Sequence, residues 1–247
     1  MRFDIMTLFP ETVRAVLDSS ITGRAQSAGI IEINTYNIRD FSRDKHRRVD
    51  DTPYGGGFGM LMMPEPVVEC HDAVMKTVPE GVRAITLYMS PKGKLFTEEK
   101  ARELAENYDD IIILCGHYEG VDRRALDLTV DEYVSVGDYV LTGGEIPACI
   151  IVDAVSRLVD GVLADPECYK NESLGFSESE GSRLLEYPQY TRPPEFRGLR
   201  VPEILLSGNH EKIDEWRRQE AIRDTARLRP DLLLHDENGE NGENGEK

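Results

Sequence analysis

Two glycine-containing loops hold the side chains with which this chain could most readily bind a ligand. The first, at 116–120, follows an apolar run at 111–115, and the second, at 137–144, follows a run at 133–136. Each run has the length and the β-branched content of a buried strand, and glycine allows backbone to approach where side chains would obstruct it. The loops offer tyrosine, glutamate, leucine and backbone groups but no lysine suited to phosphate. This set fits an uncharged aromatic ring such as adenine, together with ribose hydroxyls or an amino group met by a carboxylate.

A third loop, beginning at Ser90-Pro91, follows a strand expected at 83–89. Any one of the three loops could be an ordinary tight turn. Together they favour a ligand pocket, because α/β proteins bind small ligands at the carboxyl ends of buried strands. The sequence excludes two other nucleotide sites: there is no GxxxxGK[ST] motif, and the glycines at 55–59 do not join a strand directly to a helix.

The elements that must position these loops alternate between strand and helix, which indicates an α/β domain with a largely parallel sheet. Strands are expected at 3–8, 29–34, 83–89, 111–115 and 133–136, and helices from Pro10, Pro64, Thr97, Arg123 and Pro147. The helix from Pro10 should turn Val13, Val16 and Leu17 toward the core.

The composition changes after residue 163. We expect a linker at 164–181, a smaller helical domain at 182–235 with a helix near 211–227 and a last short one from Pro230, and a disordered acidic tail at 236–247.

The overall composition is that of a soluble globular protein, with 40% hydrophobic and 30% charged residues among 247. No apolar run approaches the roughly 20 residues that span a bilayer, and the N-terminus lacks a signal-peptide core, so a cytoplasmic location is expected. The four cysteines are widely spaced and should be free, mostly buried thiols. The five histidines form no metal-ligand spacing, and no structural metal is expected.

The net charge of −17 argues against a polyanionic partner unless positive charge is concentrated locally. One such concentration is the irregular segment 39–63, which begins with Arg39, Arg43, Lys45, Arg47 and Arg48. A long irregular loop inside a compact domain is usually functional or disordered, and the aromatic and apolar residues of this one favour a function. Segment 182–229 has ten basic residues against eight acids, which taken alone indicates an ordinary solvated surface.

The chain resembles the bacterial tRNA (guanine-N1)-methyltransferases that modify the guanosine 3′ of the anticodon, a family of the SPOUT class. The matching motifs are LFPE at 8–11, TGRA at 22–25, DDTPYGGG at 50–57, GMLM at 59–62, SP at 90–91, CGHYEGVD at 115–122, GDYVL at 137–141, GGE at 143–145, PQYTRP at 188–193 and LSGNH at 206–210.

The resemblance implies a fold and a cofactor that periodicity does not. The sheet would carry a deep trefoil knot, a rare exception to the rule that chains do not thread loops, formed by the loops after the strands at 83–89, 111–115 and 133–136. Residues 1–163 would bind S-adenosylmethionine in a bent shape. The implied cofactor-binding residues are Tyr88, Met89, Ser90, Pro91, Gly116, Tyr118, Glu119, Gly120, Val136, Gly137, Asp138, Tyr139, Val140, Leu141, Gly143, Gly144 and Pro147.

It also implies partners. Family members are obligate homodimers whose active sites are built from both chains, and they bind the anticodon arm of tRNA through the basic loop and the C-terminal domain. The implied tRNA-binding residues are Arg43, His46, Arg48, Asp50, Tyr54, Gly57, Ser207, Asn209 and His210.

The chemistry requires a general base, because guanine N1 carries a proton at neutral pH, and a positive group near O6, where negative charge develops. In the family the base is an Asp followed by Ser in the interdomain linker, with an Arg fifteen positions upstream. Here those positions are Glu172, followed by Ser173, and Arg157. Glutamate replaces the usual aspartate and reaches one methylene further. Asp165 and Asp50 are the alternatives for the base, and an assisting Mg²⁺ is left open.

Two other functions stay open at this point. One is a SPOUT methyltransferase acting on a different RNA nucleotide, and the other is a non-catalytic RNA-binding protein on the same fold.

Overall fold

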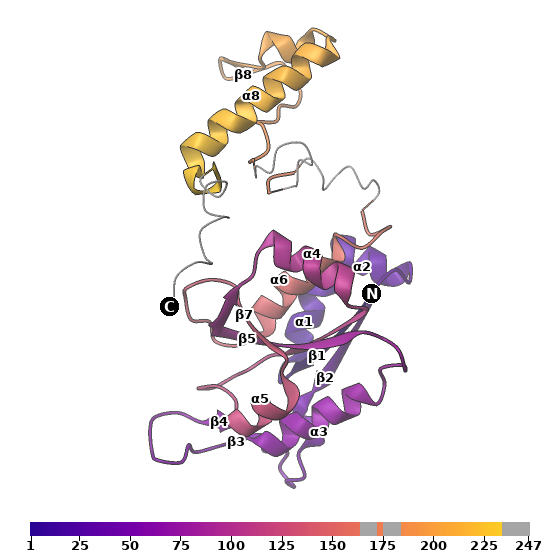
Figure 1. Cartoon of the computed structure of the whole chain (residues 1–247), viewed down its shortest axis with the longest axis vertical. Helices are drawn as coiled ribbons and strands as arrows, with labels where there is room; N and C mark the ends of the chain where they lie inside the picture. The colour runs from indigo at the N-terminus through magenta and orange to yellow at the C-terminus, as the bar shows by residue number, and fades with distance from the viewer. Residues whose placement is uncertain (164–171, 175–183, 234–247) are drawn as a thin grey trace, which may run out of the picture. The chain divides into compact units, whose positions relative to one another are not determined.

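A computed structural model describes residues 1–163, 172–174 and 184–233 of the chain (Figure 1). The chain divides into two compact units, Met1–Ala164 and Asp165–Lys247. Most of the linker expected at 164–181 and the whole acidic tail at 236–247 lie outside the described residues.

The first unit is built on a five-stranded sheet in the order β2-β1-β6-β5-β7, in which every pairing is parallel. The strands are β1 (Arg2–Thr7), β2 (Glu32–Asn37), β5 (Ala84–Leu95), β6 (Asp110–Leu114) and β7 (Glu132–Ser135). The expected α/β fold with a parallel sheet is therefore confirmed.

Helices cover both faces of this sheet, which explains why its strands are almost continuously apolar. One face carries α1 (Pro10–Leu17), α2 (Ser20–Ser27), α4 (Glu98–Asn107) and α6 (Glu145–Ser156), and the other carries α3 (Pro64–Met75) and α5 (Arg123–Thr129) (Figure 1). On β6, Ile111 and Ile113 enter the core of the first face, whereas Ile112 and Leu114 enter the core of the second.

Side-chain caps explain where two of these helices begin. The hydroxyl of Thr97 accepts a hydrogen bond from the Lys100 amide at 3.4 Å, as expected for the start of α4. The carboxylate of Asp122 accepts one from the Arg124 amide at 2.9 Å at the start of α5.

The sequence-based end of β5 was wrong. A strand end was expected at Met89, before Ser90-Pro91, but β5 continues to Leu95. Met89 and Lys94 both pair with Val134 of β7, so residues 90–93 bulge out of the strand. A Cβ on Gly93 would lie 2.3 Å from the Tyr133 carbonyl carbon, so the bulge passes directly over the β7 backbone.

Other departures from the sequence-based elements are local. The helix α2 was not predicted, because only Thr22 and Ala25 of its eight residues are buried. Val16 is 52% exposed and does not face the core with Val13 and Leu17. Other shifts include a β2 that spans 32–37 and an α6 that begins at 145, with Pro147 inside its first turn.

Within the irregular segment that follows β2, the structure places a 3-10 helix, η1 (Ile38–Phe41), and a short antiparallel pair, β3 (Asp50–Asp51) with β4 (Leu61–Met62).

The described part of the second unit is a small hairpin followed by one long helix. Its elements are β8 (Glu195–Phe196), β9 (Leu199–Arg200), the 3-10 helix η2 (Glu203–Leu206), α8 (His210–Leu228) and the 3-10 helix η3 (Pro230–Leu233). The buried Thr225 hydroxyl of α8 donates to the Ala221 carbonyl and accepts from the Leu185 amide at 2.8 Å. This bond ties the segment before the hairpin to α8.

Among the described cysteines, Cys70, Cys115 and Cys149 are free and buried, as expected, and Cys168 lies outside the described residues. None of the helices in the described ranges has the length and apolarity needed to cross a membrane.

A buried acidic pair lies at the opposite end of the sheet from the glycine loops. Asp4 and Asp110 are both fully buried, and Arg2 approaches their carboxylates at 2.6 and 3.5 Å. Neither oxygen of Asp110 has a hydrogen-bond partner within the described ranges. Burial, reinforced by the charge of Asp4, raises the pKa of Asp110 to about 6.

This arrangement predicts a pH-dependent stability. Because the folded-state pKa of Asp110 is raised, the free energy of unfolding should fall as pH rises from about 4 through 6. Asp110→Asn should remove most of that fall, a gain at pH 7.5 of up to ~3 kcal/mol for a shift of about two pKa units. Urea unfolding of both proteins at pH 4.5 and 7.5 measures it.

The neighbouring Asp109→Asn is the control of opposite sign, since hydrogen bonds from Arg83 hold the pKa of Asp109 down to about 2. Asp109→Asn should lose stability at pH 7.5 relative to low pH. Parallel pH curves for wild type and Asp110→Asn would contradict the account.

Candidate functional site

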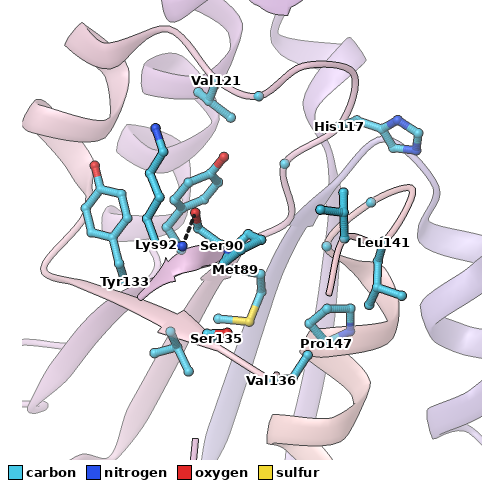
Figure 2. Close-up of a pocket in the computed structure, with 18 of the residues that line it drawn as sticks. Met89, Ser90, Lys92, His117, Val121, Tyr133, Ser135, Val136, Leu141 and Pro147 are labelled. Atoms are coloured by element: carbon cyan, nitrogen blue, oxygen red, sulfur yellow. Dashed lines mark hydrogen bonds between the residues drawn. The ribbon is translucent and has the colours of Figure 1, made fainter. Parts of the chain in front are cut away.

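A pocket of about 460 Å³ opens at the carboxyl ends of β5, β6 and β7 (Figure 2). This is within the usual size range of small-molecule sites. All of the expected cofactor-binding residues except Asp138 line it. In Figure 2, Met89 lies in the middle, with Leu141 and Pro147 on one side and Lys92 and Tyr133 on the other. The three loops singled out in the sequence therefore meet in one cavity.

The pocket is shaped by a close backbone contact between the loop after β6 and the start of α6. The Gly144 amide donates to the Gly116 carbonyl at 2.9 Å. A Cβ on Gly144 would lie 2.6 Å from the Cα of Cys115, and a Cβ on Gly116 would lie 2.9 Å from the Tyr88 ring. At Gly144 the close atoms belong to the backbone, so this position needs glycine, whereas at Gly116 the Tyr88 ring would have to shift to admit a side chain.

Two buried groups hold this contact in place. Glu145, in the first turn of α6, accepts a 2.7 Å hydrogen bond from the hydroxyl of Thr7 at the end of β1. The same Thr7 oxygen accepts from the Phe9 amide at 2.9 Å.

Burial raises the pKa of the Cys115 thiol well above its usual value, so this cysteine is a neutral packing group and not a nucleophile.

The loop after β6 holds Tyr118 in a left-handed conformation, with φ of 59°. Such a conformation is unusual for a residue other than glycine and is often found at functional sites. It is fixed locally, because the Tyr118 amide donates to Nδ1 of His117 at 3.1 Å and the Gly120 amide donates to the His117 carbonyl. The Tyr118 hydroxyl accepts from the Arg39 guanidinium at 3.3 Å.

The loop after β7 forms an apolar lip of the pocket. The Tyr139 hydroxyl donates to the Val136 carbonyl at 3.0 Å, which folds its ring back over Gly137. Val140 is 86% exposed and Leu141 is 39% exposed, although both line the cavity. An exposed apolar rim of this kind suits a flat apolar ring.

Several lining residues were not predicted. They are Leu61, Lys92, His117, Val121, Arg123, Leu126, Tyr133, Val134, Ser135 and Thr142. Lys92 lies in the β5 bulge, which was missed because the strand was predicted to end at Met89. His117 and Thr142 stand inside the predicted loops and could have been found from that fact. Leu61 and Val121 had no local signal.

Leu61 reaches the pocket because the irregular segment is joined to the loop after β6. Met62 of β4 pairs in parallel with Val121, the Glu119 amide donates to the Met60 carbonyl at 3.0 Å, and the Met62 amide donates to the Gly120 carbonyl at 2.9 Å. The segment expected to contact RNA and the loop expected to hold the cofactor are thus one hydrogen-bonded structure.

The residues of this segment that are expected to bind tRNA differ in whether they are exposed or already paired with other residues. Arg43 forms ion pairs with Glu65 and Glu69 of α3 at 3.3 and 2.5 Å, and Asp50 pairs with Met62 in the β3–β4 ladder. His46, Arg48 and Gly57 are exposed, and Tyr54 is 97% exposed at the glycine-rich tip.

The other residues expected to bind tRNA lie at the start of α8. The Asn209 side chain caps the helix by accepting from the Lys212 amide at 3.2 Å, and the Ser207 hydroxyl donates to the Ile204 carbonyl at 2.7 Å. His210 is the first, exposed residue of α8. Ser207 and Asn209 therefore have structural roles whether or not they touch RNA.

The two residues expected to be catalytic belong to different units. Arg157 is the C-terminal cap of α6, with its amide donating to the Asp153 carbonyl at 3.2 Å. Glu172 is half-buried in the described turn 172–174. The Ser173 hydroxyl accepts from the Glu186 amide at 2.9 Å and the Leu174 amide donates to the Leu184 carbonyl, which ties the turn to the second unit. Asp165, an alternative base, lies outside the described residues.

No group of three or more His, Cys, Asp or Glu side chains that could hold a metal ion occurs in the described part of the chain.

Comparison with known proteins gives a consistent picture. The family model described as tRNA (Guanine-1)-methyltransferase TrmD matches residues 1–235. A tRNA (guanine-N(1)-)-methyltransferase of Clostridioides difficile is 52% identical over 94% of this chain and 97% of its own length. Proteins of the same name from Ruminiclostridium cellulolyticum and Caldanaerobacter subterraneus are 49% and 53% identical over 94% of this chain, covering 96% and 92% of their own lengths.

The glycine contact predicts that a single methyl group at residue 144 disrupts the pocket. Gly144→Ala should lower the free energy of unfolding by about 1–3 kcal/mol, because α6 must move away from the end of β6. It should also weaken binding of S-adenosylmethionine, the ligand that the resemblance implies. The expected loss of affinity is roughly tenfold or more, because the pocket loops are displaced from their binding geometry. Thermal unfolding and titration calorimetry measure the two effects.

Gly81→Ala is the matched control. Gly81 has a φ of 84° and open space around its Cβ position, and it lies near the opposite end of β5. The control should lose about 1 kcal/mol from backbone strain but keep its affinity. Unchanged affinity in Gly144→Ala would show that the contact does not shape the pocket.

Proposed function

Because the chain belongs to the tRNA (guanine-N1)-methyltransferase family and methylates N1 of guanine in tRNA, we propose that its target is the guanosine immediately 3′ of the anticodon and that Glu172 is its general base. The observation that carries the proposed cofactor site is the meeting of the three glycine-containing loops in a single pocket at the carboxyl ends of β5, β6 and β7. The assignment of Glu172 rests on its place in the family motif.

The lining residues fit S-adenosylmethionine, on which the family depends. Leu141, Val136 and Pro147 supply apolar surface for a purine, and the glycine-rich backbone of 116–120 and 137–144 supplies hydrogen-bonding groups at close range. The Glu119 carboxylate suits a ribose hydroxyl or an amino group. When bound, this cofactor supplies an electrophilic methyl group on a sulfonium. We assign the loops to the trefoil knot of the SPOUT class, which the bulge of β5 over β7 and the Gly144 contact support.

The remaining chemistry belongs to the protein. Guanine N1 can attack only after it loses its proton, and the proposal gives that proton to the Glu172 carboxylate. The Arg157 guanidinium would stabilise the negative charge that develops on guanine O6. Correct orientation of the reactants can contribute ~7–11 kcal/mol to lowering the barrier. N1 lies on the Watson–Crick edge, so the nucleotide must be splayed out of the anticodon stack.

The homodimer, with an active site shared between its subunits, is also part of the proposal. Val16 of α1 and Ile146 and Ile150 of α6 are 52%, 56% and 40% exposed. These two helices pack against each other on the same face of the sheet (Figure 1). Exposed aliphatic side chains on adjacent helices are what a subunit interface would cover, and this accounts for the outward position of Val16.

The charge distribution fits an RNA partner if binding is local. The chain carries a net charge of −17, but residues 39–48 hold five basic residues against two aspartates. Residues 39–63 would therefore contact the anticodon arm of tRNA from the first unit, with the second unit gripping the arm as well. We place the protein in the cytoplasm, where its tRNA substrate is. Any Mg²⁺ would act only by assisting the carboxylates in catalysis, and the proposal includes no structural magnesium site.

The test of the base is Glu172→Gln. Glutamine keeps the size of the side chain but cannot accept the proton, so the rate of methyl transfer in a single turnover should fall by roughly 10²–10⁴. Binding of S-adenosylmethionine, measured by calorimetry, should not change. Glu203→Gln, an exposed glutamate of the same unit, is the control and should react at the wild-type rate. A wild-type rate in Glu172→Gln would shift the role to Asp165 or Asp50.

The test of the interface is Ile150→Asp. A charge placed on α6 should weaken dimerisation by roughly ten- to hundredfold and reduce methyl transfer with it, because a buried unpaired charge is unfavourable. Light scattering across a concentration series measures the association. Leu128→Asp, at a 71% exposed leucine of α5 on the other face of the sheet, is the control and should stay dimeric. A wild-type dimer in Ile150→Asp would place the interface elsewhere.

A further inference from the structure

The arginines of the second unit are not equally available to an RNA partner. Along α8, five basic residues are balanced by five acidic ones. Arg217, Arg223 and Arg227 each form an ion pair with an acid three residues earlier, at 3.1, 2.5 and 2.7 Å. A phosphate would have to displace these carboxylates, so the long helix presents little free positive charge.

The segment 190–200 differs from α8 in charge. It carries three arginines and one glutamate. Arg200 pairs with Glu195 across the hairpin at 2.8 Å, but neither Arg192 nor Arg197 has a carboxylate partner among the residues that the structure describes, and both are exposed. In an acidic chain, this is a local site of uncompensated positive charge.

The hairpin also exposes an apolar tip. Arg197 and Gly198 both have positive φ, at 52° and 80°, which is the pattern of a tight two-residue turn between strands. The turn sets Phe196 opposite Leu199, and these side chains are 62% and 78% exposed. The Arg197 guanidinium lies over the Phe196 ring, 5.4 Å from its centroid.

We propose that this hairpin tip, formed by Phe196, Arg197 and Leu199, is a contact site for tRNA together with Arg192, which precedes the hairpin; the aromatic ring and its guanidinium stack on an unpaired base and the arginines contact phosphates. Exposed aromatic rings and arginine planes are the groups on which single-stranded RNA bases stack. The free positive charge favours a polyanion over a protein partner. The inference rests on the proposed function only in taking tRNA as the partner, and it adds a contact at the hairpin to those expected at the start of α8.

The test uses the full-length protein and a tRNA transcript with guanosine 3′ of the anticodon. Phe196→Ala should weaken tRNA binding by roughly five- to hundredfold, the effect of losing one stacked base. Arg197→Gln should weaken binding and lower the slope of log affinity against log salt by about 0.7–0.9, the value for one lost phosphate contact. Arg223→Gln on α8 is the matched control and should bind like wild type. Filter binding at several salt concentrations gives all three values.

Further readouts keep the interpretation specific. S-adenosylmethionine affinity and the rate at saturating tRNA should stay within about twofold of wild type, with the change confined to the KM for tRNA. Arg197→Lys should keep the salt slope. Unchanged tRNA affinity in Phe196→Ala and Arg197→Gln would overturn the proposal, as would dissociation of the dimer, which would make the tip a subunit contact. If wild type binds the transcript without methylating it, the proposed function fails, but the binding data still decide this inference.

Discussion

The close approach of Gly144 to the end of β6 is the contact on which the rest of the site depends. The hydrogen bond from its amide to Gly116, with the buried bond between Thr7 and Glu145, holds the first turn of α6 against the ends of β1 and β6. The two pocket loops leave from either side of this contact. Because the approach leaves no room for a Cβ, a change of one methyl group here acts on the fold and on the cavity together.

The second constraint is the union of the pocket with segment 39–63, which we propose contacts RNA. The bonds from Glu119 and Met62 make β4 a continuation of the loop after β6, and Arg39 reaches the hydroxyl of the strained Tyr118. A rearrangement of residues 39–63 on binding RNA would therefore be felt in the pocket loop. The second unit carries the turn with Glu172 through its bonds to 184–186. The proposed cofactor pocket lies in the first unit, and the proposed base lies in the second.

Much of this architecture could be predicted from the sequence, because buried parallel strands leave continuous apolar runs and helix starts leave capping residues. Those signals located β6, β7, the Thr97 cap and the three loops. The failures have a common physical cause: they depend on contacts between distant segments. The bulge of β5 is set by its pairing with β7, and the place of Leu61 is set by the bridge from its neighbour Met62 to Val121. The outward position of Val16 is set by how α1 packs on the sheet. Glu172 could be singled out only by counting along a family motif, since nothing local distinguishes it from other glutamates.

The central claim is methyl transfer to N1 of the guanosine 3′ of the anticodon. The most direct measurement is a single-turnover assay with labelled S-adenosylmethionine on two tRNA transcripts that differ only in having guanosine or adenosine at that position, with the modified atom mapped in the product. The account predicts methylation at N1 of the guanosine transcript and none of the adenosine transcript. Equal labelling of both transcripts, or tight binding of the guanosine transcript without transfer, would contradict it.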